Sequence, residues 1–370
     1  MIHRVQATIN LAALQANFQL AKSQAAHSKM IAVIKANAYG HGLIPVAEAL
    51  GDADLFAVTD INEALSLKKG LSTGQPILIL QGIIDREDIK LICAENFQLV
   101  VHSIEQLRLL DEEINKINVQ QPLSFWLKMN SGMGRLGIAP AEYVKTYNAL
   151  KNKTYTKEVI MMTHLANSSL PDSALNAEQL SVFNNIKNEL DREHTITTSI
   201  PSSSGILADL NTQSDWARPG IMMYGSSPFN FLEESLRREP LGLQNVMTLQ
   251  SKIIAVQSLK AGDNVGYCSQ FICPHDMNIG IVCIGYADGY PSNAPNGTPV
   301  LVNDQRSATI GRVSMDMLAI DLNNIPEAKV GDPVILWGDQ LSLDEIAEKT
   351  GILSYNLTCS ISARVKFIYG

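Results

Sequence analysis

Ionisable side chains stand where several short apolar runs of the sequence end. Lys35 ends the run MIAVIK, Lys128 ends LSFWLK and His164 ends VIMMTH. Such runs are typical of buried strands, and a lysine at the end of a buried strand is partly removed from water. Desolvation lowers the pKa of the amine and makes it a nucleophile toward aldehydes. The positions of these residues therefore indicate chemistry on a carbonyl group.

Two later segments carry the small residues of an anion site. Ser203 lies within the stretch Ser202–Gly205, and Arg218 comes shortly before Gly220 and Ile221. Backbone N–H groups and hydroxyls in such loops can surround a phosphate without adding charge. A nucleophilic lysine combined with a phosphate-binding loop describes a site for pyridoxal 5′-phosphate (PLP).

Strands and helices are expected to position these residues. In the first part of the chain, eight short apolar runs alternate with amphipathic stretches. This pattern predicts an α/β fold that begins with a (β/α)8 TIM barrel, whose catalytic groups lie at the C-terminal ends of the strands. Helices are expected over Ile61–Lys69, after the N-cap Asp60, and over Ile104–Ile114, after the N-cap Ser103. The expected strands begin near Met30, Leu55, Ile77, Leu99, Leu123, Val159, Ile196 and Trp216.

After about Tyr224 the pattern changes to short apolar runs separated by Gly-Asp, Asp-Gly and Asn-Gly turns, which predicts an all-β domain. One helix should interrupt it, beginning at the capping box Ser342-Leu-Asp-Glu345. We expect residues 1–230 to form the PLP-binding barrel and residues 231–370 to form the β domain. The expected strands are Val246–Val256, Ile279–Ile284, Val300–Val302, Ala308–Val313, Leu318–Leu322, Val334–Leu336 and Val365–Tyr369.

The composition excludes several classes of function. The net charge of −8 argues against a nucleic-acid partner, which would require a basic face. No apolar run is long enough to span a membrane, and the first residues lack the pattern of a signal peptide. The five cysteines show no CxxC spacing, and no Cys or His pair has the spacing of metal ligands. This usage predicts reduced thiols in a cytoplasmic protein that holds no metal.

Five motifs, taken together, resemble the alanine racemase family. They are AVIKANAYGHG (32–42), GMGRLG (132–137), ARPGIMMYG (217–225), GYADGY (285–290) and GRVSMD (311–316), in that family's order and over nearly the whole chain. The first resembles the PLP-lysine signature. The resemblance implies a PLP-binding barrel, a C-terminal β domain, and a homodimer with shared active sites. It also implies that Val5–Ile9 forms a strand of the β domain.

The resemblance further implies roles for individual residues. Lys35 would carry PLP covalently, Arg218 would face the pyridine nitrogen, and His164 would pack on the ring. Arg135 would bond the phenolic oxygen of PLP and orient the substrate carboxylate, and Lys128 would be carbamylated to hold Arg135. Tyr267 would be the second catalytic base and would act in the partner's site. The other implied site residues are Tyr39, Ser203, Gly220, Ile221 and Tyr355 on the phosphate, Met315 on the partner's substrate, and Tyr286 and Asp316 in support.

This set has a physical rationale of its own. Racemisation removes the Cα proton from one face and returns it to the other, which requires two bases on opposite sides of PLP, here Lys35 and Tyr267. An arginine at the pyridine nitrogen cannot give up its proton, so the nitrogen stays unprotonated and the electron sink stays weak, which limits transamination. We therefore expect an isomerase that interconverts L-alanine and D-alanine. The sequence leaves open whether it supplies D-alanine for peptidoglycan precursors or breaks alanine down.

Three alternatives use the same barrel. A basic amino acid decarboxylase would carry a carboxylate at the pyridine nitrogen, which the ARPG segment (217–220) disfavours. A broad-specificity racemase for serine or basic amino acids remains possible on this fold, although such relatives are often exported or membrane-bound. A PLP carrier would be a single barrel and would need no residue like Tyr267. The chain also departs from the family pattern at Ser202, where asparagine is usual, in the segment LANSS (165–169), and at Met317.

Overall fold

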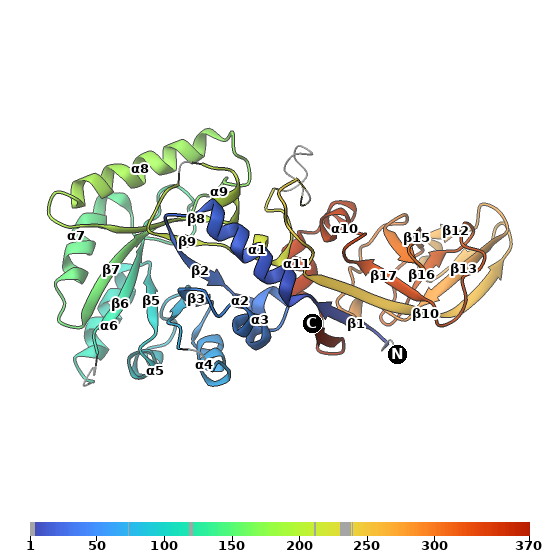
Figure 1. The fold of residues 1–370 in the computed structure, drawn as a ribbon, viewed down its shortest axis with the longest axis horizontal. Helices are drawn as coiled ribbons and strands as arrows, with labels where there is room; N and C mark the ends of the chain where they lie inside the picture. Colours follow the sequence, from blue (N-terminus) through green and yellow to red (C-terminus); the bar gives the residue numbers. More distant parts are fainter. Residues whose placement is uncertain (1–3, 73, 118–120, 211, 230–237, 239) are drawn as a thin grey trace. The chain divides into compact units, whose positions relative to one another are not determined.

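The computed structural model describes residues 4–72, 74–117, 121–210, 212–229, 238 and 240–370, which form two compact units (Figure 1). We call them the barrel unit, residues 18–38 and 42–223, and the β unit, which comprises the described parts of 1–17, 39–41 and 224–370. Each unit is described by itself below. The domain boundary expected between residues 230 and 231 lies outside the described residues and stays a prediction.

The barrel unit contains a closed barrel of parallel strands, as the sequence predicts. Neighbouring strands pair in chain order, and the barrel closes where Lys29 of the first strand pairs with Trp216 of the last. The side chains of Leu55–Val58 are all buried, as expected for a parallel strand covered on both sides. The strands are β2 (Lys29–Val33), β3 (Leu55–Val58), β4 (Ile77–Ile79), β5 (Gln98–Val101), β6 (Leu123–Lys128), β7 (Thr156–Met162), β8 (Thr197–Ser202) and β9 (Trp216–Arg218).

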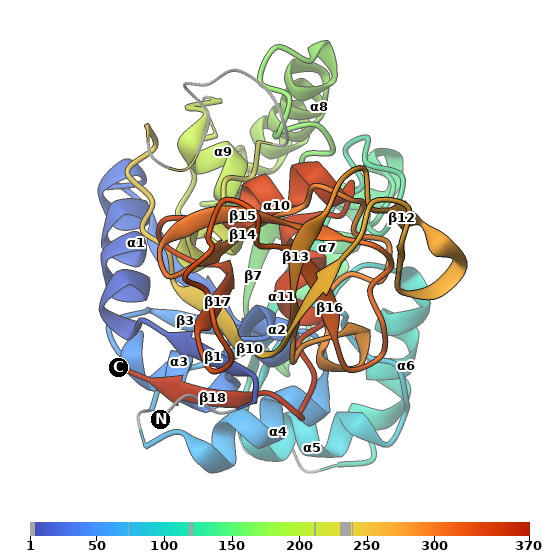
Figure 2. The same cartoon turned by 90° about the vertical axis from the view of Figure 1, so that its right-hand side faces the viewer.

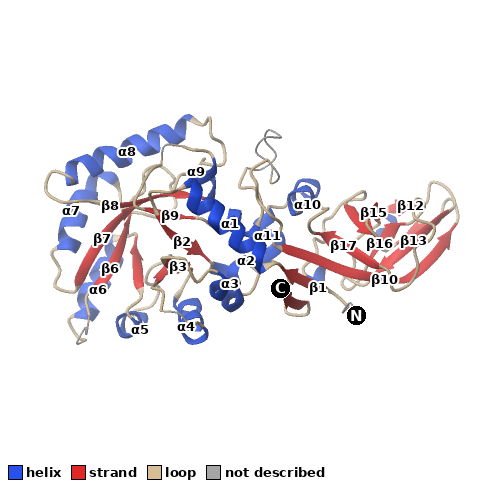
Figure 3. Ribbon diagram, viewed as in Figure 1, coloured by secondary structure: helices blue, strands red, loops and turns tan. Residues whose placement is uncertain are grey.

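Helices connect these strands (Figure 3), and two of the helices begin at a residue whose side chain caps them. Asp60 caps α4 (Ile61–Gly70) by accepting hydrogen bonds from the amides of Asn62 and Glu63 at 2.9 and 3.0 Å. Ser103 caps α6 (Ile104–Ile114) in the same way, through the amide of Gln106. Both predicted helices are confirmed. The other helices after barrel strands are α2 (Lys35–Tyr39), α3 (Leu43–Ala49), α5 (Asp88–Glu95), α7 (Pro140–Lys151), α8 (Ala174–Leu190) and α9 (Ser203–Leu207), and α1 (Leu11–Gln24) precedes the barrel.

The β unit is built on a sheet in the strand order β13-β16-β15-β14-β17-β10-β1-β18 (Figure 2). The long strand β10 also pairs with β13, so six of these strands close into a ring. The expected strands are all present, and the sequence missed the short hairpin of β11 and β12. The strands are β10 (Met247–Leu259), β11 (Asn264–Val265), β12 (Phe271–Ile272), β13 (Met277–Val282), β14 (Pro299–Val302), β15 (Gln305–Ile310), β16 (Leu318–Asp321), β17 (Pro333–Trp337) and β18 (Lys366–Tyr369).

The first strand of the chain, β1 (Gln6–Ile9), belongs to this sheet. It pairs antiparallel with β10 and parallel with β18, which confirms the strand expected over Val5–Ile9. The first and last strands of the chain are therefore neighbours, and they lie together at one edge of the sheet.

Two expectations for the β unit need correction. Ser342 does cap α10 (Leu343–Thr350), through the amide of Asp344, but Glu345 does not complete a capping box because its carboxylate pairs with Arg306 at 2.6 and 2.9 Å. The domain also has a second α-helix, α11 (Ser354–Cys359), which the sequence pattern did not reveal because it is only six residues long. Among the described residues, no helix is long and apolar enough to cross a membrane.

Candidate active site

The barrel unit brings the predicted ionisable residues to one rim. Each follows the C-terminal end of a strand, and parallel strands of a closed barrel end on the same side. Lys35 comes two residues after β2 and His164 two residues after β7, whereas Lys128 and Arg218 are the last residues of β6 and β9. Ser203 follows β8 directly.

The loop after β2 has an unusual backbone, which holds the segment that follows Lys35 in one conformation. Ala36, Asn37, Ala38 and Tyr39 all have positive φ angles, between 51° and 54°. This left-handed conformation costs roughly 1–2 kcal/mol for each residue other than glycine. The side chain of Asn37 compensates by accepting a hydrogen bond from the amide of Leu43 at 2.8 Å. We infer that the segment after the lysine is held in a strained turn that local interactions determine.

A second local contact supports this turn. Glu63, in the first turn of α4, accepts hydrogen bonds from the amides of Asn37 and Thr59 at 3.1 and 2.8 Å. One carboxylate therefore joins the loop after β2 to the loop after β3. Sequence reasoning missed both Asn37 and Glu63, although asparagine tolerates a left-handed backbone, which could have directed attention to Asn37 in KANAYGHG.

Arg218 is held in the rim by several hydrogen bonds. Its side chain is buried, and its guanidinium donates to the hydroxyl of Ser199 at 2.5 Å and to the carbonyls of Thr163 and Ile200 at 2.7 and 3.1 Å. Burial lowers its pKa to about 10, so the group stays charged at neutral pH. Its Nη2 atom also lies 3.4 Å from Nδ1 of His164. The guanidinium is thus fixed by three acceptors and faces the imidazole.

The charge state of His164 follows from this neighbourhood. The pKa of His164 is lowered to about 3, first by burial and then by the positive charges of its neighbours, which are Arg218, Lys128, Arg135 and Lys35. The imidazole is therefore neutral at physiological pH. A neutral, half-buried ring can pack against another flat ring without a charge that needs hydration.

Lys128 shares the same electrostatic environment. Burial is the largest cause that lowers its pKa to about 8, and Arg218, Arg135 and Lys35 add to the shift. Every charge that shifts this lysine is positive, which is unfavourable unless an anion enters the rim. Arg135 stands in an exposed loop after β6, where the amide of Gly134 donates to Asn130 Oδ1 at 2.9 Å. The arrangement favours a ligand that carries negative charge.

Replacing Lys128 tests this electrostatic strain. The folded-state pKa of about 8 lies below the ordinary lysine value of 10.5, so the unfolded chain binds more protons between these two pH values. The free energy of unfolding should therefore rise with pH across this window, and the cost of charging Lys128 is fully present below pH 8. We expect Lys128→Met to raise the free energy of unfolding at pH 7, in buffer free of bicarbonate, by up to about 3 kcal/mol.

The measurement is urea unfolding of both proteins between pH 7 and pH 10.5. The advantage of Lys128→Met should shrink as pH rises through the window, because the wild-type amine then becomes neutral in both states. An advantage that does not depend on pH would show that packing, and not charge, separates the two proteins.

The loops after β8 and β9 form a compact group of hydroxyls and amides. The buried hydroxyl of Ser203 accepts hydrogen bonds from the amides of Gly220 at 2.8 Å and Met222 at 3.3 Å. Ser204 lies 2.6 Å from Ser168, a residue of the LANSS segment, and 3.4 Å from Ser202. The two segments that depart from the family pattern are thus in hydrogen-bond contact through serine hydroxyls.

These residues fit an anionic, flat cofactor such as PLP. The rim supplies four cationic side chains together with a group of buried hydroxyls and backbone amides, and a phosphate requires this kind of donor set. The neutral ring of His164 offers a flat partner beside them. Among the described residues, no group of His, Cys, Asp and Glu side chains could hold a metal ion.

The β unit assembles a separate group of aromatic residues. The ring of Tyr39 stacks on Tyr224 with centroids 4.8 Å apart and lies 5.9 Å from the ring of Tyr355. Burial raises the pKa of Tyr355 to about 12 and that of Tyr39 further still. Both phenols are therefore protonated at neutral pH and can donate hydrogen bonds. Tyr224 was not among the expected site residues, although it stands in the motif ARPGIMMYG.

The remaining predicted residues lie on the surface of the β unit. Tyr267 is 69% exposed and begins a short 3-10 turn, Tyr267–Ser269, between β11 and β12. Met315 and Tyr286 are also exposed, and their loops contact each other through the backbone, because the amide of Ala287 donates to the Met315 carbonyl at 3.0 Å. Arg312 reaches the same region, with Nη1 3.7 Å from the sulfur of Cys268.

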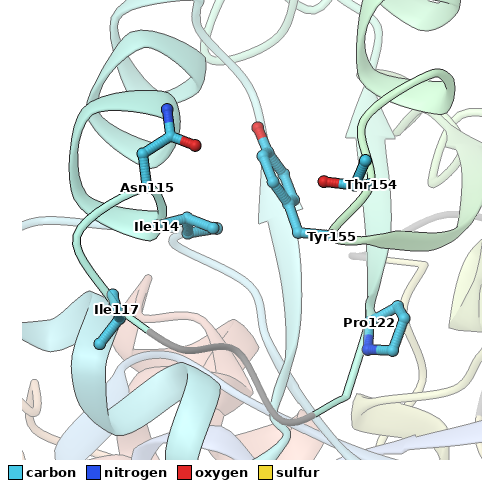
Figure 4. A pocket seen from close by; sticks show the side chains of 6 residues that line it. All are labelled: Ile114, Asn115, Ile117, Pro122, Thr154 and Tyr155. Carbon is cyan, nitrogen blue, oxygen red and sulfur yellow. The ribbon is translucent and has the colours of Figure 1, made fainter.

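A cavity in the barrel unit lies at the opposite end of its strands. Pro122 and Tyr155, which line it, come just before β6 and β7, whereas Lys128 and His164 follow the other ends of these strands (Figure 4). The Tyr155 hydroxyl donates to Asp111 Oδ1 at 2.7 Å. This cavity is therefore separate from the candidate active site. The other lining residues are Ile114, Asn115, Ile117 and Thr154.

Comparison with known proteins agrees with this geometry. The family model "Alanine racemase, N-terminal domain" matches residues 9–228, and "Alanine racemase, C-terminal domain" matches residues 246–369. The catabolic alanine racemase of Pseudomonas putida is 42% identical over 357 residues, which is 96% of each chain.

Solved structures give the same result. The biosynthetic alanine racemase of Pseudomonas aeruginosa is 38% identical, with a TM-score of 0.93 and full coverage of both chains. The alanine racemase of Bartonella henselae, whose structure contains covalently bound pyridoxal phosphate, is 25% identical, with a TM-score of 0.88 and full coverage of both chains. From its sequence, its two matched domains and its fold, the chain belongs to the PLP-dependent alanine racemase family of isomerases.

Proposed function

We propose that this chain interconverts L-alanine and D-alanine, with PLP held on Lys35, and that Lys35 and the partner subunit's Tyr267 serve as the two bases. The observation that carries this proposal is the rim of the barrel, where a lysine at a strand end stands among cations that all favour an anionic ligand. When bound, PLP withdraws electrons from the substrate and makes its Cα proton acidic.

The residues that would hold PLP contact different parts of the cofactor. Arg218, fixed by its three acceptors, would donate to the pyridine nitrogen, and it cannot accept a proton in return. His164, neutral and half-buried, would pack on the ring. Arg135 would bind the phenolic oxygen and the substrate carboxylate, with carbamylated Lys128 as its anionic support. The phosphate would be bound by Tyr39, Ser203, Gly220, Ile221 and Tyr355.

The two proton-transferring atoms are Lys35 Nζ and the phenolic oxygen of the partner subunit's Tyr267. A racemase needs one on each face of the substrate, because the proton removed from one side must be replaced from the other. Lys35 is the residue that starts the strained turn, so its side chain begins at a fixed point of the rim. Tyr267 is exposed on the β unit, as a residue must be if it serves another chain.

This assignment makes the active enzyme a homodimer with shared sites. We also place it in the cytoplasm, because the cysteines are odd in number and none of them are in CxxC spacing, as is typical of reduced thiols. The relatives include both a catabolic and a biosynthetic racemase, so the same site chemistry serves either role in the family.

Substrate selection tests the proposed pocket. Tyr355 and the partner subunit's Met315 would wall a space that holds a methyl group and little more. Each additional methylene in a filled pocket costs about 1–3 kcal/mol, or roughly 10–200-fold in kcat/KM. We therefore expect alanine to be racemised faster than 2-aminobutyrate, and both far faster than lysine or arginine.

The measurement is α-proton exchange with solvent deuterium over a panel of L- and D-amino acids. Serine distinguishes volume from polarity, because its side chain is only one hydroxyl larger than that of alanine. Turnover of lysine comparable with that of alanine would place the chain among broad-specificity racemases and would contradict the proposal.

A further inference from the structure

Two loops of the β unit that carry exposed apolar side chains are joined into one body. The amides of Tyr286 and Ala287 donate to the carbonyls of Ser314 and Met315 at 3.1 and 3.0 Å. The loops approach so closely at Gly285 that a Cβ atom there would lie 2.2 Å from the Ser314 oxygen, so only glycine fits. Displacing one loop must therefore displace the other.

This joined body presents Met315, Met317 and Tyr286 to solvent. Large apolar side chains on a loop that is fixed by its backbone do not collapse onto the surface of their own domain. They are pre-positioned for a contact outside the β unit, and the proposed contact of Met315 is the substrate pocket of the partner subunit.

The buried carboxylate of Asp288 fixes the two joined loops to the rest of the β unit. Asp288, in the first of the two loops, is fully buried, and its Oδ2 atom accepts a hydrogen bond from the amide of Gly285 at 3.1 Å. Its Oδ1 atom forms an ion pair with Arg4, and Nε of Arg364 lies 3.6 Å from it. A buried carboxylate needs such cationic partners, because water no longer stabilises its charge.

Arg364 connects this anchor to the tip of the second loop. While its Nε faces buried Asp288, its Nη2 donates to Oδ1 of Asp316 at 2.6 Å, and Asp316 is the residue after Met315. The backbone before Arg364 is fixed in the same place, because the amide of Ser362 donates to the Asp288 carbonyl at 3.1 Å. One planar guanidinium thus joins a buried and an exposed carboxylate.

The contact between Arg364 and Asp316 differs from an ordinary surface ion pair. Exposed pairs contribute little, because both side chains lose freedom when they meet. Here the guanidinium is already held by Asp288, so Asp316 gains a fixed partner and the flexibility of the loop tip falls. The two arginines and two aspartates of the network also balance in charge, so the anchor leaves no buried charge unpaired.

We propose that Arg364 is a positioning residue for substrate selection: it holds Asp316, and through it Met315, where the partner subunit's pocket requires a wall. The inference rests on the proposed function, in which Met315 limits the size of the substrate. It adds a residue outside the motifs that carry the catalytic groups, and it assigns a role to the network of Arg4, Asp288, Arg364 and Asp316.

The test compares Arg364→Gln and Asp316→Asn holoenzymes with wild type. The readout is the ratio of kcat/KM for alanine to kcat/KM for 2-aminobutyrate. Since one methylene in a filled pocket is worth roughly 10–200-fold, a wall that has become mobile should lower the ratio by about 5–10-fold. Alanine KM should rise more than kcat falls. The double variant should match Arg364→Gln, because Arg364→Gln already removes the contact that Asp316→Asn weakens.

Two further variants make the test specific. Arg306→Gln is the matched control, because Arg306 is an exposed arginine of the same unit in a two-point pair with Glu345, near the start of β15, whereas the loop of Met315 follows the end of that strand. Its selectivity ratio should equal that of wild type. Arg364→Lys should restore the ratio only in part, because an ammonium group lacks the planar fork that reaches both carboxylates.

The outcomes separate this inference from the proposed function. If Met315→Ala lowers the ratio but Asp316→Asn and Arg364→Gln do not, the inference about Arg364 is wrong and the role of Met315 stands. If Met315→Ala leaves the ratio unchanged, the proposed pocket wall is wrong. If Arg364→Gln does not fold, Asp316→Asn alone decides, because it leaves the pair of Asp288 with Arg4 intact.

Discussion

A Lys35→Ala protein should racemise alanine at least about 10³-fold more slowly than wild type in both directions. The substitution removes the covalent anchor of the cofactor and one of the two bases, and a positioned general base alone contributes roughly 10²–10⁴-fold. Lys128 also lies within electrostatic range of Lys35, but it starts from the end of a different strand, β6. The measurement is the rate of D-alanine formation from L-alanine, and the reverse.

Borohydride reduction of the holoenzyme identifies the anchor directly. Wild-type protein that is reduced, digested and mapped should carry a pyridoxyl group on Lys35. Lys128→Met is the matched control, because it removes the other rim lysine and should leave the label in place. A label on any lysine other than Lys35, or a labelled Lys35→Ala protein, would contradict the assignment.

The architecture of the barrel could be predicted because its signals are local. Asp60 and Ser103 cap their helices through amides two or three residues away, so such caps can be recognised from residues that are neighbours in the sequence. The same holds for short apolar runs that end in Lys35 or Lys128, because a buried strand must be apolar throughout. The rim of the site follows from these strands.

Other features depend on residues far apart in sequence. Glu345 looks like the second half of a capping box, but Arg306 draws its carboxylate away, 39 residues earlier in the chain. Two of the three acceptors that fix Arg218 are the carbonyls of Thr163 and Ile200, and a carbonyl oxygen has no sequence signature. The left-handed turn after Lys35 was also missed, because propensities assign such a backbone to glycine and not to alanine.

The resemblance to a family supplied what local patterns could not. Tyr267 is an exposed residue between two short strands, and nothing in its surroundings distinguishes it from a packing residue. Its role as a base rests on the motif around it and on the requirement of racemisation for a second proton-transferring group. An experiment on Tyr267 therefore tests two parts of the proposed mechanism directly, the second base and the shared site.

Replacing Tyr267 should separate the two enantiomers of alanine. Tyr267→Phe removes the phenol, so one face of the substrate loses its acid and base. Solvent deuterium entry from that enantiomer should fall by about 10²-fold or more, while the other enantiomer still exchanges its α-hydrogen through Lys35. Net racemisation is lost in both directions. Tyr369→Phe, at another partly exposed tyrosine of the β unit, is the matched control and should exchange both enantiomers normally.

Mixing two inactive proteins shows which subunit Tyr267 serves. If the site is shared, a dimer of Tyr267→Phe with Lys35→Ala has one site that lacks both bases and one site that is intact. Activity should then reappear on mixing, at no more than half of the wild-type value per mixed dimer. If Tyr267 serves its own chain, each site of the mixed dimer lacks one base and the mixture stays inactive. Subunit exchange is verified with differently tagged wild-type chains, so a mixture that exchanges but stays inactive would refute the shared site.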